Sequence, residues 1–189
     1  MRIVSGTHKS KRITAPKNLP VRPTTDMAKE SLFNILNNNY YFDEVRVLDL
    51  FSGTGNISYE FASRGTEHIL CIDENVNCIR FIQKTAKELG FESISTVKAD
   101  AFEFLDKHKQ EHDIIFADAP YELEGLDKIV AAVFAKKILS QDGVLVIEHS
   151  KEQDFSELPY FVNSRRYGNV NFSFFEWEEE DEDEQEEED

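Results

Sequence analysis

Five short, mainly apolar runs are spaced through the middle of the chain, and each has about the length of a β-strand. Branched apolar residues dominate most of them, which is typical of strands that are buried on both faces of a parallel sheet. Polar residues and turn residues separate one run from the next. The runs span residues 45–50, 67–72, 93–98, 113–118 and 144–148.

The segments between these runs have apolar residues at every third or fourth position, which is the spacing of an amphipathic helix. A first helix is predicted after a cap at Thr25 or Asp26, and it ends at the asparagines 37–39. Because strands and helices then alternate, we expect an α/β fold in which helices cover both faces of a doubly wound sheet. The other predicted helices span residues 56–64, 76–89 and 126–139, the last followed by a turn at Asp142-Gly143.

The two ends of the chain add to this core. Residues 160–166 and 170–177 are predicted as two strands joined around Gly168 and Asn169, and we expect them to form an antiparallel edge of the sheet. The sheet is therefore expected to have seven strands, most of them parallel. Before the first helix, residues 2–12 predict a short hairpin, and the prolines that follow it predict an extended connector.

The composition is compatible with one principal domain, because 189 residues with 40% hydrophobic content can bury one sizeable core. The sequence has no apolar run of ~18 residues and no leader that is basic and then apolar, so we expect a cytoplasmic protein without a membrane span. Cys71 and Cys78 form no CxxC motif and no histidines cluster near them, so neither a disulfide framework nor a zinc site is expected.

Charge is distributed unevenly along the chain, whose net charge is −16. Residues 176–189 hold 12 of the 37 acidic residues and no basic one, and so little apolar content predicts a solvated tail. The first 25 residues carry six basic residues and no acidic one, as expected of an arm that meets phosphates or, equally, of a flexible terminus. These basic residues are Arg2, Lys9, Lys11, Arg12, Lys17 and Arg22.

A glycine-rich turn follows the first predicted strand, in the sequence Asp49-Leu50-Phe51-Ser52-Gly53-Thr54-Gly55. Gly53 and Gly55 allow a tight turn and let a ligand approach the backbone N–H groups closely. A dinucleotide site would need a third glycine, and Ser58 stands in its place. The Asp49 carboxylate can pair with the ammonium group of a ligand such as S-adenosylmethionine, and NAD has no such group.

Two further acidic residues end apolar runs. Asp73 closes the second run about 18 residues after Gly55, where a carboxylate can accept hydrogen bonds from two ribose hydroxyls, or can simply be a solvated strand end. Asp118 closes the fourth run, and the sequence Asp118-Ala119-Pro120-Tyr121 delivers a carboxylate, a proline-restricted turn and an aromatic ring together. Open α/β sheets bind ligands at this edge, so we expect chemistry there, although an isolated motif of this kind can be an ordinary turn.

Taken together, these motifs resemble the RsmD family of class I S-adenosylmethionine-dependent methyltransferases, whose members methylate the exocyclic N2 of a guanine in bacterial small-subunit (16S) ribosomal RNA. The resemblance runs from Met1 to about Trp177, and it implies a Rossmann-like fold, S-adenosylmethionine as donor, S-adenosylhomocysteine as product and no metal. The motifs that carry it are the glycine turn, Arg22-Pro23-Thr24-Thr25-Asp26 with Glu30 and Phe33-Asn34-Ile35-Leu36, Ser63-Arg64-Gly65, and Asp118-Ala119-Pro120-Tyr121.

The resemblance also implies roles for single residues. In the tetrad 118–121, the carboxylate and the next backbone carbonyl would accept hydrogen bonds from the target amine, and the aromatic ring would stack on the base. Such acceptors can aim the nitrogen lone pair at the sulfonium methyl, so that positioning supplies much of the rate. For the cofactor, Asp49, Phe51, Gly53 and Gly55 would line the methionine and ribose part, Asp73 would hold the ribose hydroxyls, and Asp100 with Ala101 would meet the adenine edge.

The sequence departs from the family at position 119, where the usual pattern reads Asp-Pro-Pro followed by Tyr or Phe. Ala119 still has its carbonyl, and Pro120 still favours an extended conformation at residue 119. Stiffness is lost rather than an acceptor. Residues expected to contact RNA are Arg2, Lys9, Lys11, Arg12, Arg22 and Thr24, although Arg22 and Thr24 could instead set the entry of the first helix.

Two other functions stay open. The first is a non-catalytic RNA-binding or ribosome-assembly factor that retains the fold, and the second is adenine-N6 methylation of DNA, because the same tetrad could present that amine. The absence of an obvious target-recognition domain favours RNA. The expected organisation is an arm at 1–24, a methyltransferase domain at 25–177 and an acidic tail at 178–189, acting as a cytoplasmic monomer on ribosomal RNA in a small-subunit particle.

Overall fold

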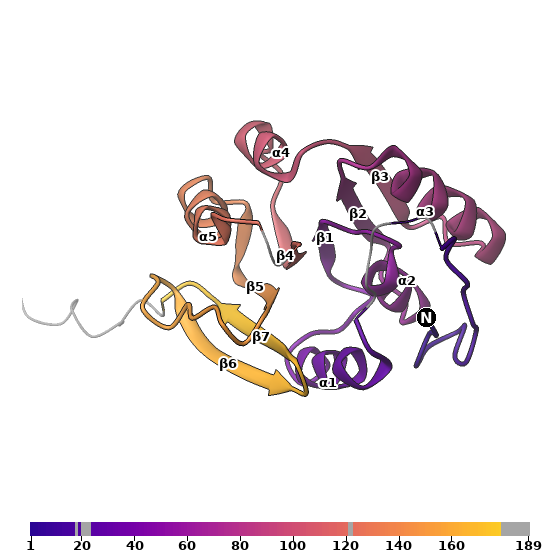
Figure 1. Cartoon of the computed structure of the whole chain (residues 1–189), viewed down its shortest axis with the longest axis horizontal. Coiled ribbons are helices and arrows are strands. Elements are labelled where there is room, and N and C mark those ends of the chain that lie inside the picture. Colours follow the sequence, from indigo (N-terminus) through magenta and orange to yellow (C-terminus); the bar gives the residue numbers. More distant parts are fainter. Residues whose placement is uncertain (18, 20–23, 121–122, 179–189) are drawn as a thin grey trace, which may run out of the picture.

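The computed structural model describes residues 1–17, 19, 24–120 and 123–178, and within them seven strands form one sheet in the order β3-β2-β1-β4-β5-β7-β6 (Figure 1). The first five are parallel to one another, and β7 is antiparallel to both β5 and β6. This confirms the expected α/β sheet with an antiparallel edge. The strands are β1 (Arg46–Leu50), β2 (His68–Asp73), β3 (Ile94–Lys98), β4 (His112–Asp118), β5 (Leu139–His149), β6 (Phe161–Tyr167) and β7 (Val170–Phe175).

The helices begin and end at residues with clear local causes. The Thr25 hydroxyl accepts a hydrogen bond from the Ala28 N–H and caps α1, and Asn75 caps α3 in the same way through the Asn77 N–H. Gly90 ends α3 in the left-handed conformation. The helices are α1 (Asp26–Leu36), α2 (Asn56–Ser63), α3 (Val76–Leu89), α4 (Ala101–Lys107) and α5 (Leu126–Ala135).

Two elements differ from the prediction. The short helix α4 was not predicted, and it is nucleated by Asp100, whose carboxylate accepts hydrogen bonds from two backbone N–H groups of the first turn. Helix α5 ends at Ala135, and Asp142-Gly143 lies inside β5 rather than in a turn before it. Gly143 passes the neighbouring strand so closely that a Cβ would lie 2.9 Å from the Asp113 carbonyl oxygen. The local sequence could not predict this contact, because it joins residues that are far apart in the chain.

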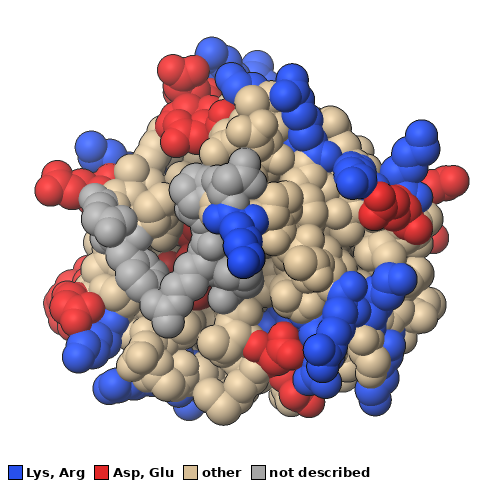
Figure 2. Space-filling model, turned by 45° about the vertical axis from the view of Figure 1, so that its right-hand side comes forward, with Lys and Arg blue, Asp and Glu red and all other residues tan. Residues whose placement is uncertain are grey.

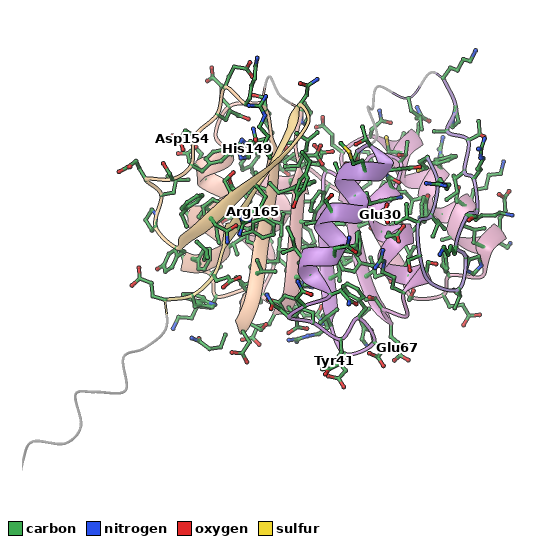
Figure 3. The ribbon with its side chains drawn as sticks, turned by 90° about the horizontal axis from the view of Figure 1, so that it is seen from below. Glu30, Tyr41, Glu67, His149, Asp154 and Arg165 are labelled. Atoms are coloured by element: carbon green, nitrogen blue, oxygen red, sulfur yellow. The ribbon has the colours of Figure 1, made fainter. Side chains whose placement is uncertain are left out.

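Each face of the sheet has its own core. One cluster joins the sheet to α1, α2 and α3, and includes Leu32, Val47 and Phe116. The other joins it to α4 and α5, and includes Leu48 and Ile129. In Figure 3, Glu30 marks α1 on the first of these faces, and His149 marks the carboxyl end of β5. Because side chains alternate along a strand, Asp49, Asp118 and Glu148 lie on the same face as Val47, Phe116 and Val146 of the first cluster.

The N-terminal segment lies against α2 and folds back on itself through a bridge between Arg2 and Arg12, as the hairpin prediction required. Gly6 has a positive φ, and a Cβ there would lie 1.8 Å from the Ser63 carbonyl oxygen, so only glycine allows this close approach. Residues 179–189, most of the predicted acidic tail, lie outside the described part of the chain. None of the described helices is long and apolar enough to cross a membrane.

Candidate functional site

A cavity of about 640 Å³ opens at the carboxyl ends of the central strands. The glycine turn after β1, the start of α1, the ends of β2, β4 and β5, and the β6–β7 turn all contribute to its wall. This is the edge at which open α/β sheets bind their ligands. Its polar and charged lining includes Thr24, Asp49, Asn56, Asp73, Asp118 and Glu148.

The glycine turn is held in an unusual backbone conformation. Phe51, Gly53 and Gly55 all have positive φ, and a Cβ at Gly55 would lie 2.8 Å from the Tyr59 ring. The Gly53 N–H donates to the Asp73 carboxylate and the Gly55 N–H donates to the Ser52 carbonyl, at 2.8 and 2.7 Å. Both N–H groups are therefore bonded within the protein, so what the two glycines offer a ligand is close approach to the backbone.

Asp49 is 2% exposed at the end of β1 and lines the cavity. The Ser58 hydroxyl donates a hydrogen bond to its carboxylate, so the residue that replaces the third glycine of a dinucleotide site orients this acid. Burial, together with the nearby charge of Asp73, raises the pKa of Asp49 to about 7. A cationic ligand group would favour the ionised form, which fits the predicted pairing with an ammonium.

The Asp73 carboxylate lies between the glycine turn and the start of α3. One oxygen accepts the Gly53 N–H, the other accepts the Asn75 N–H, and both distances are 2.8 Å. Each carboxylate oxygen can accept a second bond, so two ribose hydroxyls can still bind there. Burial raises the pKa of Asp73 above its ordinary value.

A smaller cavity of about 110 Å³ lies beside Asp73. Its apolar walls include Phe51, Ile72 and Ala99, and Asp100 and Ala101 close one end. Apolar walls with a polar edge are a suitable environment for a flat aromatic ring such as adenine. The predicted cofactor residues are thus brought together around two adjoining cavities, and their chemistry fits the ammonium, the ribose and the adenine of S-adenosylmethionine.

Asp118 ends β4 with its side chain half-buried at the cavity wall. Burial and the nearby carboxylates of Glu148 and Asp49 raise its pKa well above the ordinary value. Ala119 is 2% exposed and also lines the cavity, as does Pro120. Tyr121, predicted to stack on the base, lies outside the described residues, as does Arg22.

Glu148 was not predicted as a site residue. It ends the apolar run of β5, is 3% exposed, and stands directly opposite Asp118 in the register of the two parallel strands. Thr24 donates a hydrogen bond of 2.8 Å to its Oε2, and burial raises the pKa of Glu148 to about 7. An acid at the carboxyl end of an apolar run is the signal that singled out Asp73 and Asp118, and it would have found Glu148 too.

The basic residues of the N-terminal segment lie on its outer surface. Lys9, Lys11 and Arg12 are exposed, whereas Arg2 forms a surface ion pair with Asp26 at 3.0 Å. Figure 2 shows Lys and Arg side chains spread over several parts of one face of the molecule, interspersed with Asp and Glu. Met1 Sδ lies 3.7 Å from the Thr54 hydroxyl of the glycine turn, so the segment begins beside the cavity. Within the described residues, no group of three or more His, Cys, Asp or Glu side chains could hold a metal ion.

Proteins that resemble this chain in sequence or structure are named as methyltransferases. The Bacillus subtilis protein "Putative rRNA methyltransferase YlbH" is 34% identical over 161 residues, which cover 83% of this chain and 86% of that one. Ribosomal RNA small subunit methyltransferase D of Buchnera aphidicola subsp. Baizongia pistaciae is 30% identical over 148 residues, covering 78% and 75%. The solved structure "Putative methyltransferase yhhF from Escherichia coli" has a TM-score of 0.83 at 21% identity, covering 94% and 99%, and this likeness supports the Rossmann-like class I methyltransferase fold.

The family comparison covers almost the whole described chain. The family described as "Conserved hypothetical protein 95" matches residues 1–176, which include the N-terminal segment, the glycine turn and the Asp118 tetrad. This is the span over which the motifs resemble the RsmD family. The chain therefore belongs to this family, the RsmD family of methyltransferases.

Proposed function

We propose that this protein transfers a methyl group from S-adenosylmethionine to the exocyclic N2 of a guanine in 16S ribosomal RNA. The observation that carries the proposal is the meeting of Asp49, Asp73 and Asp118 around one cavity with an adjoining apolar slot. The rRNA methyltransferase names of its relatives support the substrate class. Such an RNA is reached in the cytoplasm, and the protein is proposed to act as a monomer on a small-subunit particle.

The chain's residues would divide the work between two ligands. S-adenosylmethionine, when bound, supplies an electrophilic methyl group on a sulfonium. Asp49 holds the ammonium, Asp73 the ribose hydroxyls, and the small cavity beside Asp100 and Ala101 the adenine. Asp118 and the Ala119 carbonyl accept hydrogen bonds from the guanine amine and aim its lone pair, so most of the acceleration comes from orientation.

The proton released by the methylated amine also needs an acceptor. The Asp118 carboxylate is the group placed against the amine in this proposal, and its raised pKa makes it a better proton acceptor than an ordinary aspartate. The proton moves from the nitrogen to Asp118 and then to solvent through the mouth of the cavity. Activity should therefore increase with pH as Asp118 ionises.

The RNA must approach with its phosphates on the basic N-terminal segment, and the target guanine must leave its stack to enter the cavity. The proposal assigns phosphate contacts to Lys9, Lys11 and Arg12, which are exposed. Affinity for RNA should then fall steeply as salt is raised. The acidic tail beyond residue 178 has no assigned part in this reaction.

The test is transfer of labelled methyl from S-adenosylmethionine to ribosomal RNA, offered naked and in small-subunit particles, followed by mass spectrometry of the nucleosides. We expect the wild-type protein to place label in N2-methylguanosine. This label should be lost in Asp118→Ala and kept in Asp127→Ala, a control at an exposed position. Label in DNA adenine would instead support the adenine-N6 alternative. No transfer to any substrate, with cellular function unchanged in Asp118→Ala, would favour the non-catalytic assembly factor.

A further inference from the structure

Three carboxylates, those of Asp49, Asp118 and Glu148, line one cavity, and they lie near one another without a basic partner among the described residues. Within that part of the chain, the side-chain donors that meet them are two hydroxyls, Ser58 on Asp49 and Thr24 on Glu148. Buried acids without cations or sufficient donors destabilise a protein. Such a cluster is best explained by ligands that bring several N–H groups into the cavity.

The proposed function uses only two of these acids. The cofactor ammonium accounts for Asp49, and the guanine amine accounts for Asp118. Glu148 has no partner in that scheme apart from Thr24, although it is nearly as buried as Asp49. A buried carboxylate with few partners costs folding free energy. Glu148 is therefore expected to destabilise the folded protein.

The register of the sheet puts Glu148 beside the reacting group. Asp118 and Glu148 are paired residues of two adjacent parallel strands, whose backbones lie about 4.8 Å apart, and both side chains follow the same face of the sheet. Thr24 occupies Oε2 of Glu148 with its hydroxyl. The Oε1 atom has no hydrogen-bond donor among the described residues, so it is the better placed of the two oxygens to accept a bond from a base held at Asp118.

The Watson–Crick edge of guanine presents two neighbouring donors, the N2 amine and N1–H. Adenine presents an amine next to N1, which is an acceptor and would face the Glu148 oxygen with like polarity. A site built to accept a hydrogen bond rejects a ligand that lacks the donor, because a buried polar group is then left unpaired. Two neighbouring carboxylates can therefore accept hydrogen bonds from both donors of guanine, whereas the N1 acceptor of adenine leaves one carboxylate without a donor.

We propose that Glu148 is a specificity residue that accepts the N1–H of the target guanine, while Asp118 and the Ala119 carbonyl hold its N2 amine. Thr24 fixes the Glu148 carboxylate for this contact. This inference rests on the proposed function, and it deepens that function by naming the group that would separate guanine from adenine. Without the bond from N1–H to Glu148, the guanine would be held at this edge only through its N2 amine.

The experiment replaces the target guanine with 2-aminopurine, which keeps the C2 amine but has an unprotonated N1 and no O6. The target is first mapped by mass spectrometry of RNA methylated by the wild-type protein. Synthetic RNAs with either base, in the naked or assembled form that accepts methyl groups, are then compared by kcat/KM. The wild type should prefer guanine on the order of 100-fold or more.

Glu148→Gln should narrow this preference to about tenfold or less, because its amide can donate to an unprotonated N1 as well as accept from N1–H. The missing O6 affects both proteins alike, so the change in the ratio isolates residue 148. Glu111→Gln, an exposed acid at the other end of β4, should keep the wild-type ratio. Competition binding of the two RNAs with S-adenosylhomocysteine present gives the ratio of their affinities without turnover, and Glu148→Gln should narrow this ratio as well.

An unchanged preference in Glu148→Gln, whether or not its melting temperature falls, would overturn the inference and leave Glu148 a structural residue. A wild type that accepts 2-aminopurine as well as guanine would also overturn it. Failure of the proposed function has a different signature, because the wild-type protein would then transfer no methyl group to guanine in any ribosomal RNA.

Discussion

Two regions of this protein bury acids in opposite ways. Between α1 and α2, Glu60 accepts the N–H groups of Val4 and Ser5 and lies 3.5 Å from the buried Lys29 ammonium and 2.9 Å from Arg64. Each of its oxygens is satisfied by the protein itself. This network ties the N-terminal segment to the core, because Lys29 also donates to the Arg2 carbonyl.

At the cavity, Asp49 and Glu148 each receive one side-chain hydroxyl from the described residues, and burial raises the pKa of both to about 7. The difference separates two uses of a buried charge. A carboxylate that the protein fully satisfies holds the fold together, whereas one with few partners is held ready for a ligand that brings its own donors.

The largest effect on activity should come from Asp118→Asn, which removes a negative charge from the cavity. Methyl transfer should fall by about 10²–10³-fold, because the asparagine amide oxygen can still accept a hydrogen bond from the amine but carries no negative charge and cannot take up its proton. The melting temperature should stay the same or rise, since a charge that is costly to hold in the folded state is gone. Radiolabel transfer and thermal unfolding on the same preparation measure both, and a large loss of stability would contradict the assignment.

Glu60→Gln should do the reverse. It should lower the free energy of unfolding by about 3 kcal/mol, because the Lys29 ammonium remains buried without its anion. Binding of S-adenosylmethionine per folded molecule should change little. Urea unfolding and calorimetry provide the two measurements, and a variant as stable as the wild type would show that the network is not structural.

The pH dependence of the free energy of unfolding provides a test of the cavity acids in the wild-type protein. Burial raises the pKa values of Asp49 and Glu148 to about 7 in the folded protein, above their values in the unfolded chain. Below pH 4 both states are protonated at these acids, so the acids do not lower the free energy of unfolding. As pH rises from there through 7, the unfolded state ionises more readily than the folded state, and stability is lost. The free energy of unfolding should fall by on the order of 5 kcal/mol between pH 5 and pH 8, about half of it from each acid. Urea titrations across this range should show a flatter profile in Glu148→Gln, and an equal slope in both proteins would count against the cavity acids as its cause.

The smallest effect is expected from Glu88→Gln, which breaks an exposed pair with Lys84 at 3.8 Å on the surface of α3. The free energy of unfolding should change by less than about 0.5 kcal/mol, because solvent screens such pairs. Urea unfolding beside Glu60→Gln makes this the matched control for burial. If Glu88→Gln lowered the free energy of unfolding as much as Glu60→Gln, then burial of the ion pair would not explain the loss of stability in Glu60→Gln.

By itself, the sequence determined the strands, most of the helices, the glycine turn and three acids of the site, because these depend on short-range patterns of apolar and turn residues. Asp73 and Asp118 could be found because each ends an apolar run, and Asp49 because it stands just before the glycine turn. Membership of the RsmD family was confirmed, whereas the roles of all the site residues, Tyr121 and Arg22 among them, remain predictions.

Only the tertiary structure decided which acids meet one another and which are satisfied. The pairing of Glu148 with Asp118 depends on β5 lying next to β4, and its bond to Thr24 joins residues 124 positions apart. The end of an apolar run can point to Glu148, but no local pattern tells that the protein satisfies Glu60 through its N-terminal segment and leaves Glu148 with a single hydroxyl donor among the described residues. Burial and pairing are long-range properties, set by how the elements pack rather than by the residues on either side.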